Sequence, residues 1–203
     1  MNQARVIGLV ALAVGATTLA ATTVHASVGR GAQSRPNVEL CGGNLWRMKT
    51  LSDVRRGSVN LVPRNTTIGA ILKRGTPRPT PRRRTTPFQR RMWAVPAQIT
   101  RYWREGDELR LQLWDHGSYM NAVVPGPSCL TSATRDRGAI TATWSRFMNH
   151  CGRATRNSQP LGAVVTVIGV GFWSQRRSRH GEAPNGAELH PVTAFRPVAG
   201  CGS

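Results

Sequence analysis

The feature that most constrains the fold is a strict alternation of leucine with other residues in the segment 108–115. Its sequence, ELRLQLWD, has a leucine at every second position between Leu109 and Leu113. A period of two places the leucines on one face of a β-strand and the remaining side chains on the other face. We therefore expect a strand that has one face in an apolar core.

Further segments rich in β-branched and aromatic residues surround this strand and are separated by turn residues. The expected strands are 93–103, 108–115, 118–125, 163–173 and 188–195. One helix is expected between the third and fourth strands, because apolar side chains recur there at helical spacing. We expect that stripe to face the core; it consists of Ile140, Trp144, Phe147, Met148 and Cys151.

Three strands, one helix and two further strands follow each other in the order found in the OB-fold. We therefore predict a mainly β protein with one helix, an OB-fold-like five-stranded barrel in residues 92–203. A small β-sandwich is the alternative. In the N-terminal extension, residues 27–91, we expect extended segments at 44–53 and 58–63 and a short helix at 66–72.

The first 26 residues have the composition of a secretory signal peptide. Arg5 precedes an apolar or small-residue run over 6–21, and the triplet VHA ends at Ala26. An uncleaved membrane helix is the alternative, although the run is shorter than the ~20 residues of a full span. We predict a secreted or periplasmic protein that is cleaved near Ala26.

Four cysteines remain in the mature chain, and an even number in an exported protein predicts two disulfides. They lack the close pairs of a structural zinc site. Cys129 and Cys151 flank the expected helix, which favours a bond between them and leaves Cys41 to pair with Cys201. That pairing requires a short helix, since a helix filling the whole interval would hold its ends ~30 Å apart.

Charge is the most unusual property of the composition. Lysine and arginine number 28 against nine acidic residues, which gives a formal net charge of +19 at pH 7. Such an excess attracts polyanions, although a high arginine content can also reflect genome composition. The run 73–91 holds eight cations and four prolines, which predicts an extended, solvated segment that is either a binding arm or a linker.

We predict non-catalytic binding of a polyanion, either a nucleic acid or an acidic envelope polymer. The arm 73–91 and the loop 174–181 would supply cations, and aromatic residues on the strands would supply stacking surfaces, Trp103 among them. The predicted binding residues are Arg82, Arg83, Arg84, Arg90, Arg91, Arg110, Trp114, Tyr119, Arg176, Arg177, Arg179 and His180.

Five segments also resemble, in the same order, parts of a family of small exported bacterial proteins. They are MKTLSD (48–53), VNLVPRNTTI (59–68), VPGPSC (124–129), VTVIGVGFW (165–173) and HGEAPNGAELHPV (180–192). The resemblance covers nearly all of the mature chain, and the last segment is its most specific part. It implies export and this fold, but no particular activity.

The segment 180–191 allows two further interpretations. In a secreted hydrolase or nuclease-like enzyme, His180, Glu188 and His190 would act together, with the last two on one strand face. Alternatively, Asn185-Gly186 is a turn before a strand, and the protein is a structural or interaction module of the envelope. Nine acidic residues leave little material for a multi-carboxylate metal site, so we expect no metal and no cofactor.

Overall fold

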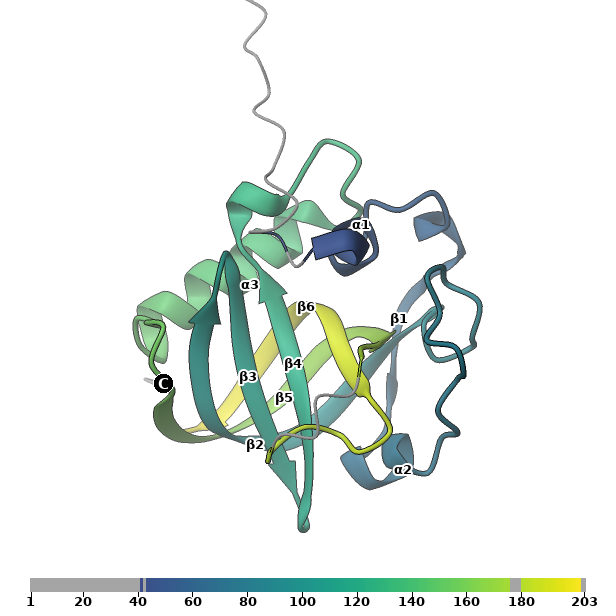
Figure 1. Ribbon diagram of the computed structural model, residues 1–203. Coiled ribbons are helices and arrows are strands. Elements are labelled where there is room, and N and C mark those ends of the chain that lie inside the picture. The colour runs from purple at the N-terminus through teal and green to yellow at the C-terminus, as the bar shows by residue number, and fades with distance from the viewer. Residues whose placement is uncertain (1–40, 42, 176–179, 202–203) are drawn as a thin grey trace, which may run out of the picture. The chain divides into compact units, whose positions relative to one another are not determined.

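Six strands form one mixed sheet in the part of the chain that the computed structural model describes, which is residue 41 and residues 43–175 and 180–201. Figure 1 shows their arrangement. The strands are β1 (Asn60–Asn65), β2 (Arg91–Glu105), β3 (Glu108–Asp115), β4 (Ser118–Pro125), β5 (Gln159–Trp173) and β6 (Ala187–Ala199). The α-helices in the same ranges are α1 (Trp46–Lys49), α2 (Ile68–Leu72) and α3 (Arg137–His150).

The hydrogen bonding of the sheet closes into a ring. Its strand order is β1-β2-β3-β4-β6-β5, and β5 also pairs with β2. Strands β4 and β6 are parallel, as are β1 and β2, whereas the other pairs are antiparallel. From β2 onward the element order is three strands, a helix and two strands, which confirms the predicted order. Strand β1 adds to the ring from outside.

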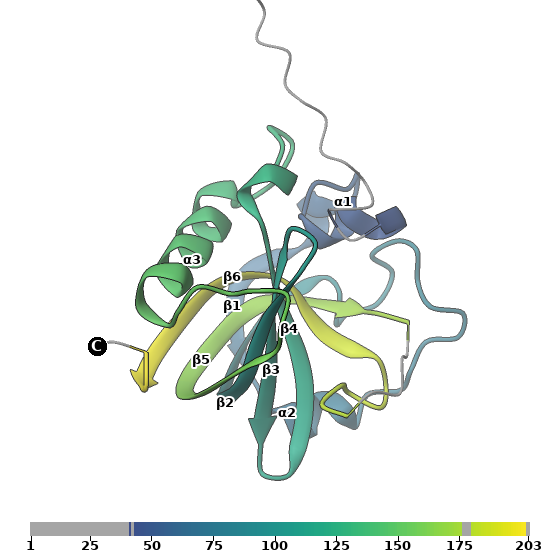
Figure 2. The same cartoon turned by 60° about the vertical axis from the view of Figure 1, so that its left-hand side comes forward.

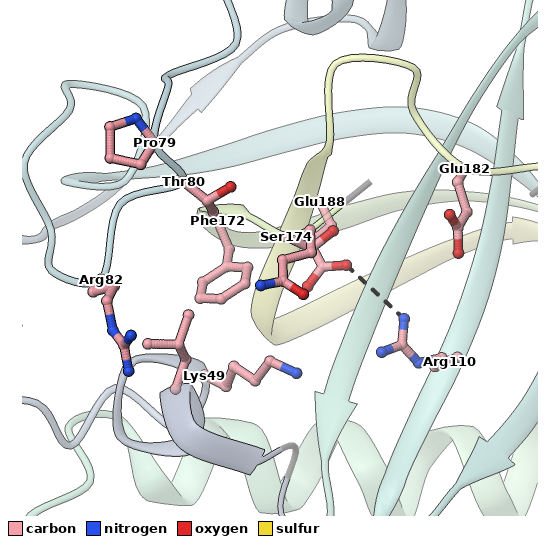
Figure 3. Close-up of a pocket in the computed structure, with 11 residues that line it drawn as sticks. Lys49, Pro79, Thr80, Arg82, Arg110, Phe172, Ser174, Glu182 and Glu188 are labelled. Atoms are coloured by element: carbon pink, nitrogen blue, oxygen red, sulfur yellow. Dashed lines mark ion pairs between the residues drawn. The ribbon is translucent and has the colours of Figure 1, made fainter. Parts of the chain in front are cut away.

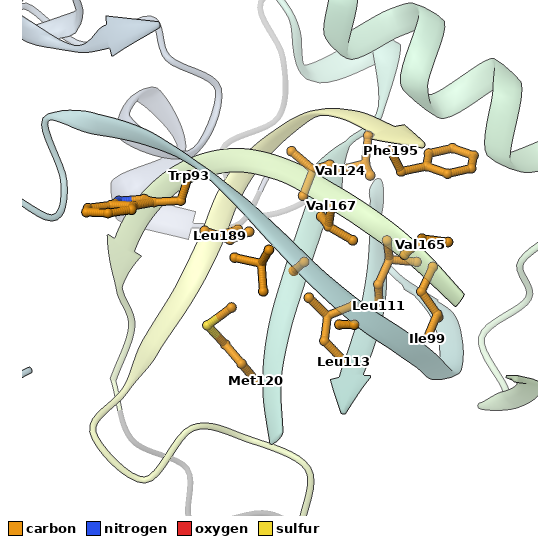
Figure 4. Packing of buried hydrophobic residues seen from close by; sticks show 14 of the residues in the cluster. Trp93, Ile99, Leu111, Leu113, Met120, Val124, Val165, Val167, Leu189 and Phe195 are labelled. Atoms are coloured by element: carbon orange, nitrogen blue, oxygen red, sulfur yellow. The ribbon is translucent and has the colours of Figure 1, made fainter. Parts of the chain in front are cut away.

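The core fills the inside of the ring. Leu109, Leu111 and Leu113 are fully buried there, as the alternation predicts, and Figure 4 shows Leu111 and Leu113 packed with side chains of the neighbouring strands. Burial of each such side chain stabilises the fold by roughly 1.5–3 kcal/mol. The strand ring is thus held by one continuous apolar cluster.

Helix α3 lies against β6 (Figure 2), and the Thr143 hydroxyl donates a hydrogen bond of 2.6 Å to the Thr193 carbonyl. The predicted apolar stripe is confirmed. Ile140 and Phe147 are fully buried, and the other members are partly buried and packed on the core.

The residues before β2 also contribute to the core. Ile68 and Ile71 of α2 and Phe88 belong to the same buried cluster as the strands. The short helix at 66–72 is confirmed, with Thr67 capping it through a hydrogen bond from the Ala70 amide. The extended segment expected at 44–53 is wrong, since this stretch contains a 3-10 turn and α1.

The basic run 73–91 is only partly solvated. Arg82, Arg83 and Arg90 are exposed, whereas Arg84 and Gln89 have no exposed surface. The expectation of an extended, solvated arm is therefore wrong at Arg84 and Gln89, and the Arg84 guanidinium lies among polar groups that satisfy its donors.

Two disulfides are present, as predicted, but neither the predicted Cys41–Cys201 bond nor the predicted Cys129–Cys151 bond is formed. Cys41 bonds Cys129, and Cys151 bonds Cys201. The predicted Cys129–Cys151 bond is wrong because α3 separates these residues: its 14 residues span about 21 Å. Cys201 instead follows β6, the strand on which α3 packs.

Several predictions concern residues outside the described ranges, namely the signal peptide 1–26 and Arg176, Arg177 and Arg179. Among the helices within the described ranges, none combines the length and the apolar character needed to cross a bilayer.

Candidate functional site on the outer face of β3, β4 and β6

The polar face of β3 forms the centre of the candidate site. Glu108 and Arg110 alternate with the core leucines and therefore point to the outside of the ring. On the same face, Asn121 of β4 lies beside Glu188 of β6 in the strand register. These side chains are nevertheless almost completely buried, which requires each charge to have a partner.

Arg110 is the point at which the carboxylates meet. Its guanidinium forms ion pairs with Glu105, with Glu108 at 3.6 Å and with Glu188 at 3.9 Å. Burial alone would lower the pKa of Arg110, but the carboxylates of Glu188, Glu108, Glu105 and Glu182 raise it above its usual value. Four of the nine acidic residues of this basic chain thus gather around one arginine.

His190 lies behind Arg110 and between two of these carboxylates. Its Nδ1 is 3.3 Å from Glu188 Oε1, and its Nε2 is 3.4 Å from Glu108 Oε1. The imidazole has no exposed surface, and this burial lowers the pKa of His190 well below its usual value, although the Glu108 carboxylate opposes the shift. The ring is therefore neutral at pH 7.

A neutral imidazole donates through only one nitrogen, so it cannot donate to both carboxylates. When Nδ1 donates to Glu188, Nε2 presents a lone pair toward Glu108 Oε1. Both of these atoms are buried without a hydrogen-bond partner. The trio Glu108–His190–Glu188 therefore contains a position where an additional proton would form a hydrogen bond.

Two adjoining cavities open onto this charged cluster. The first, cavity 1, encloses ≈ 470 Å³. Figure 3 shows Lys49 of α1 and Arg110 of β3 pointing toward one another in it, with Glu188 of β6 paired to Arg110. The Lys49 ammonium is 3.6 Å from Glu108 Oε1. Arg82 and Phe172 also line cavity 1.

The second, cavity 2, encloses ≈ 560 Å³ beside the end of β2. Arginines and aromatic rings line it together, and they come from β2, β3, β4 and the loops before β5 and β6: Arg101, Trp103, Arg110, Tyr119, Arg156 and His180. The Tyr119 and His180 rings are 5.1 Å apart between centroids. Arg110 and Glu182 line both cavities, so the two are neighbours on one face.

The structure brings some predicted binding residues together and separates others. Arg110, Tyr119 and His180 meet at cavity 2, and Arg82 lines cavity 1. Trp114 is exposed but lines neither cavity. Arg83 and Arg90 are exposed, and Arg91 begins β2.

Arg84 is a correction. We expected it to contact a ligand, but its guanidinium donates to Asp53 at 2.9 Å and to the backbone carbonyls of Gln89 and Met48. With no exposed surface and these donors engaged, it is not available to a phosphate.

Sequence reasoning missed Lys49, Arg101, Glu105, Glu108 and Arg156. The alternation in β3 already placed Glu108 on the face of Arg110, so this residue could have been found. Lys49 and Arg156 lie in segments with no periodic pattern, and only the tertiary fold brings them to the strands.

The segment 180–191 combines two of its expected roles. Asn185 and Gly186 form the predicted turn: Gly186 has a φ of 76°, and the Ala187 amide donates to Asn185 Oδ1. Glu188 and His190 share a strand face as predicted. His180, however, contacts the Tyr119 ring at a tilted angle in cavity 2 and does not join them.

Comparison with known proteins assigns no family: no family model and no curated protein matches the chain. Among solved structures, it is similar to a Leishmania major Friedlin protein assigned as an aspartyl-tRNA synthetase, with 13% identity and a TM-score of 0.42 over 70% of this chain and 22% of that chain. The asparaginyl-tRNA synthetase of Pyrococcus horikoshii, complexed with asparaginyl-adenylate, has 18% identity and a TM-score of 0.32 over 55% of this chain and 20% of that chain. This chain thus spans about a fifth of the length of either synthetase, and the likeness is too distant to identify a ligand.

Proposed function

We propose that this protein binds single-stranded nucleic acid on the outer face of β2, β3 and β4, and that its strand ring is a barrel of the OB type. Strands β2 to β6 have the order and the inserted helix of a five-stranded OB-fold. In such folds the face of the second and third strands, with the loop between the last two, binds oligonucleotides or oligosaccharides. Here that face is β3 and β4, and that loop contains His180.

The observation that carries the proposal is the lining of cavity 2. Three arginines and three aromatic rings, counted among its described lining residues, meet in one hollow. Arginines neutralise phosphates along a strand, and aromatic rings stack on its unpaired bases. A sugar polymer with carboxylate groups would use the arginines but would gain less from the rings.

Location and overall charge support the same proposal. Two disulfides are compatible with an oxidising compartment, and the first 26 residues have the composition of a signal peptide. A net charge of +19 would speed the encounter with a polyanion at low salt.

Fluorescence anisotropy with a labelled single-stranded DNA, measured at several salt concentrations, tests the proposal. We expect Arg101→Ser and Arg156→Ser each to reduce the salt slope by about 0.7, because each removes one phosphate contact. Tyr119→Ala should weaken binding by roughly 1–3 kcal/mol and leave the slope unchanged. Arg146→Ser, an exposed change on α3, is the matched control.

Two outcomes contradict the proposal. The first is equal loss of affinity in Arg146→Ser and Arg101→Ser, which would mean that charge acts without a site. The second is tighter binding of an acidic polysaccharide than of DNA at equal salt, with no effect of Tyr119→Ala, which would assign the face to an envelope polymer.

A further inference from the structure

Cavity 1 brings together a carboxylate, an ammonium and a guanidinium from separate elements. The Glu188 carboxylate comes from β6, the Lys49 ammonium from α1 and the Arg110 guanidinium from β3 (Figure 3). Cavity 2 adjoins it through Arg110 and Glu182. A strand bound in cavity 2 would therefore bring a neighbouring phosphodiester to these three groups.

The residues behind Glu188 suit a role in proton transfer. His190 Nε2 and Glu108 Oε1 are buried, 3.4 Å apart and without a hydrogen-bond partner. A proton that enters the trio Glu108–His190–Glu188 creates the missing hydrogen bond between these two atoms. The buried pair thus offers a proton taken up by Glu188 a geometric route toward Glu108 through the His190 ring, which stays neutral.

We propose that cavity 1 cleaves RNA by internal transesterification, with Glu188 as the general base and Lys49 as the general acid. This inference rests on the proposed binding of a single strand, and it departs from the expectation of a non-catalytic protein. RNA is the fitting substrate because its 2′-hydroxyl is an internal nucleophile already held next to the phosphorus. Its attack needs only a base, an acid and a cation for the developing charge.

The bonds and protons balance within the cavity. Glu188 takes the proton of the 2′-hydroxyl as the 2′-oxygen forms a bond to phosphorus. The bond from phosphorus to the 5′-oxygen breaks, and that oxygen takes a proton from the Lys49 ammonium. The products are a 2′,3′-cyclic phosphate and a 5′-hydroxyl, and Lys49 regains its proton from solvent as Glu188 releases one.

As Glu188 takes up the proton, Arg110 loses the charge of one of its carboxylate partners, and its guanidinium then stabilises the negative charge that develops on the phosphoryl oxygens. His190 and Glu108 are positioning residues, since they contact Glu188 and Lys49 and lie behind the cavity wall. Glu182, which lines both cavities, marks the passage between the strand-binding and the cleaving region.

Three oligonucleotides of one sequence test the inference, in buffer with EDTA: RNA, DNA and fully 2′-O-methylated RNA. We expect all three to bind and only the RNA to be cleaved, with a 2′,3′-cyclic phosphate end. Glu188→Gln should reduce the cleavage rate by roughly 10²–10⁴-fold, as the loss of a general base predicts.

A second variant, at Lys49 on α1, tests the inference without any change to β6. Lys49→Met should slow the cleavage of ordinary RNA, but RNA with sulfur in place of the 5′-oxygen should be cleaved at the wild-type rate. A thiolate leaves without a proton, so the acid is no longer needed.

The failures are distinguishable. Absence of binding to the 2′-O-methyl strand overturns the proposed function. Binding without cleavage of RNA overturns only the catalytic inference, as does cleavage of DNA, or equal cleavage by the wild type and Glu188→Gln.

Discussion

Arg84 and His190 both have no exposed surface, but the groups around Arg84 differ from those around His190. Arg84 keeps its charge because Asp53 and two backbone carbonyls accept from its guanidinium. Burial lowers its pKa, whereas the Asp53 carboxylate raises it, and Arg84 thereby fixes the second half of the basic run to the segment after α1. His190 instead stays neutral, which makes the stability of the protein depend on pH.

The first prediction concerns this pH dependence. The unfolded chain protonates the imidazole near its ordinary pKa of about 6.5, whereas burial holds the pKa of folded His190 well below that value. Below pH 6.5 the unfolded state binds a proton that the folded state does not bind. His190 therefore lowers the free energy of unfolding as the pH falls, by up to about 1.4 kcal/mol per pH unit.

Urea denaturation at pH 7.5, 6.5 and 5.5 measures this effect. We expect the stability difference between the wild type and His190→Gln to shrink toward acid pH, because the variant lacks the titrating group. His150→Gln, at an exposed position near the end of α3, should parallel the wild type. A constant difference between wild type and His190→Gln would contradict the prediction.

At the scale of elements, Asn185 joins the loop before β6 to α2. Its side-chain amide donates to the carbonyls of Ile71, Leu72 and Arg74, at 3.0, 3.3 and 3.2 Å. These carbonyls lie at the end of α2 and just after it, where few backbone donors are left to reach them, although the Arg74 amide also donates to the Ile71 carbonyl. The contact therefore holds α2 against the loop that contains Glu182, a residue that lines both cavities.

We expect Asn185→Ala to lower the free energy of unfolding by roughly 1–3 kcal/mol, because the three carbonyls lose the hydrogen bonds of the Asn185 amide. Urea denaturation measures it, with Asn157→Ala, at an exposed loop position, as the control. A similar loss in both variants would mean that the contact with α2 contributes little.

The strands were predictable because their pattern is local. Leucines at every second position of β3 and an apolar stripe on α3 report directly which side chains are buried. The charged site was less predictable, since Lys49 and Glu188 are far apart in the sequence and meet only through the strand order. The burial of Arg84 gave no local signal either, because its proline-rich neighbourhood is typical of solvated chain.

At the scale of the whole molecule, the two disulfides connect the ring to the segments around it. Cys41–Cys129 ties the N-terminal segment to the turn before α3, and Cys151–Cys201 ties the end of α3 to the end of β6. The bonds close loops with sequence separations of 88 and 50. Because the entropy of loop closure depends on the logarithm of loop length, the two should stabilise the protein to a similar degree.

We therefore expect Cys151→Ser with Cys201→Ser, and Cys41→Ser with Cys129→Ser, each to lower the free energy of unfolding by roughly 4 kcal/mol. Urea denaturation measures the loss, and peptide mapping without reductant identifies the pairs. Recovery of a peptide joining Cys129 to Cys151 would show that the pairing differs from the one described.

The order of the cysteines in these pairs has a consequence for biogenesis. In chain order, the first cysteine bonds the second and the third bonds the fourth. A chain that enters an oxidising compartment N-terminus first presents Cys41 and Cys129 before the other two arrive. An oxidase that joins thiols in order of emergence would then produce the native set directly, without an isomerase to exchange wrong bonds.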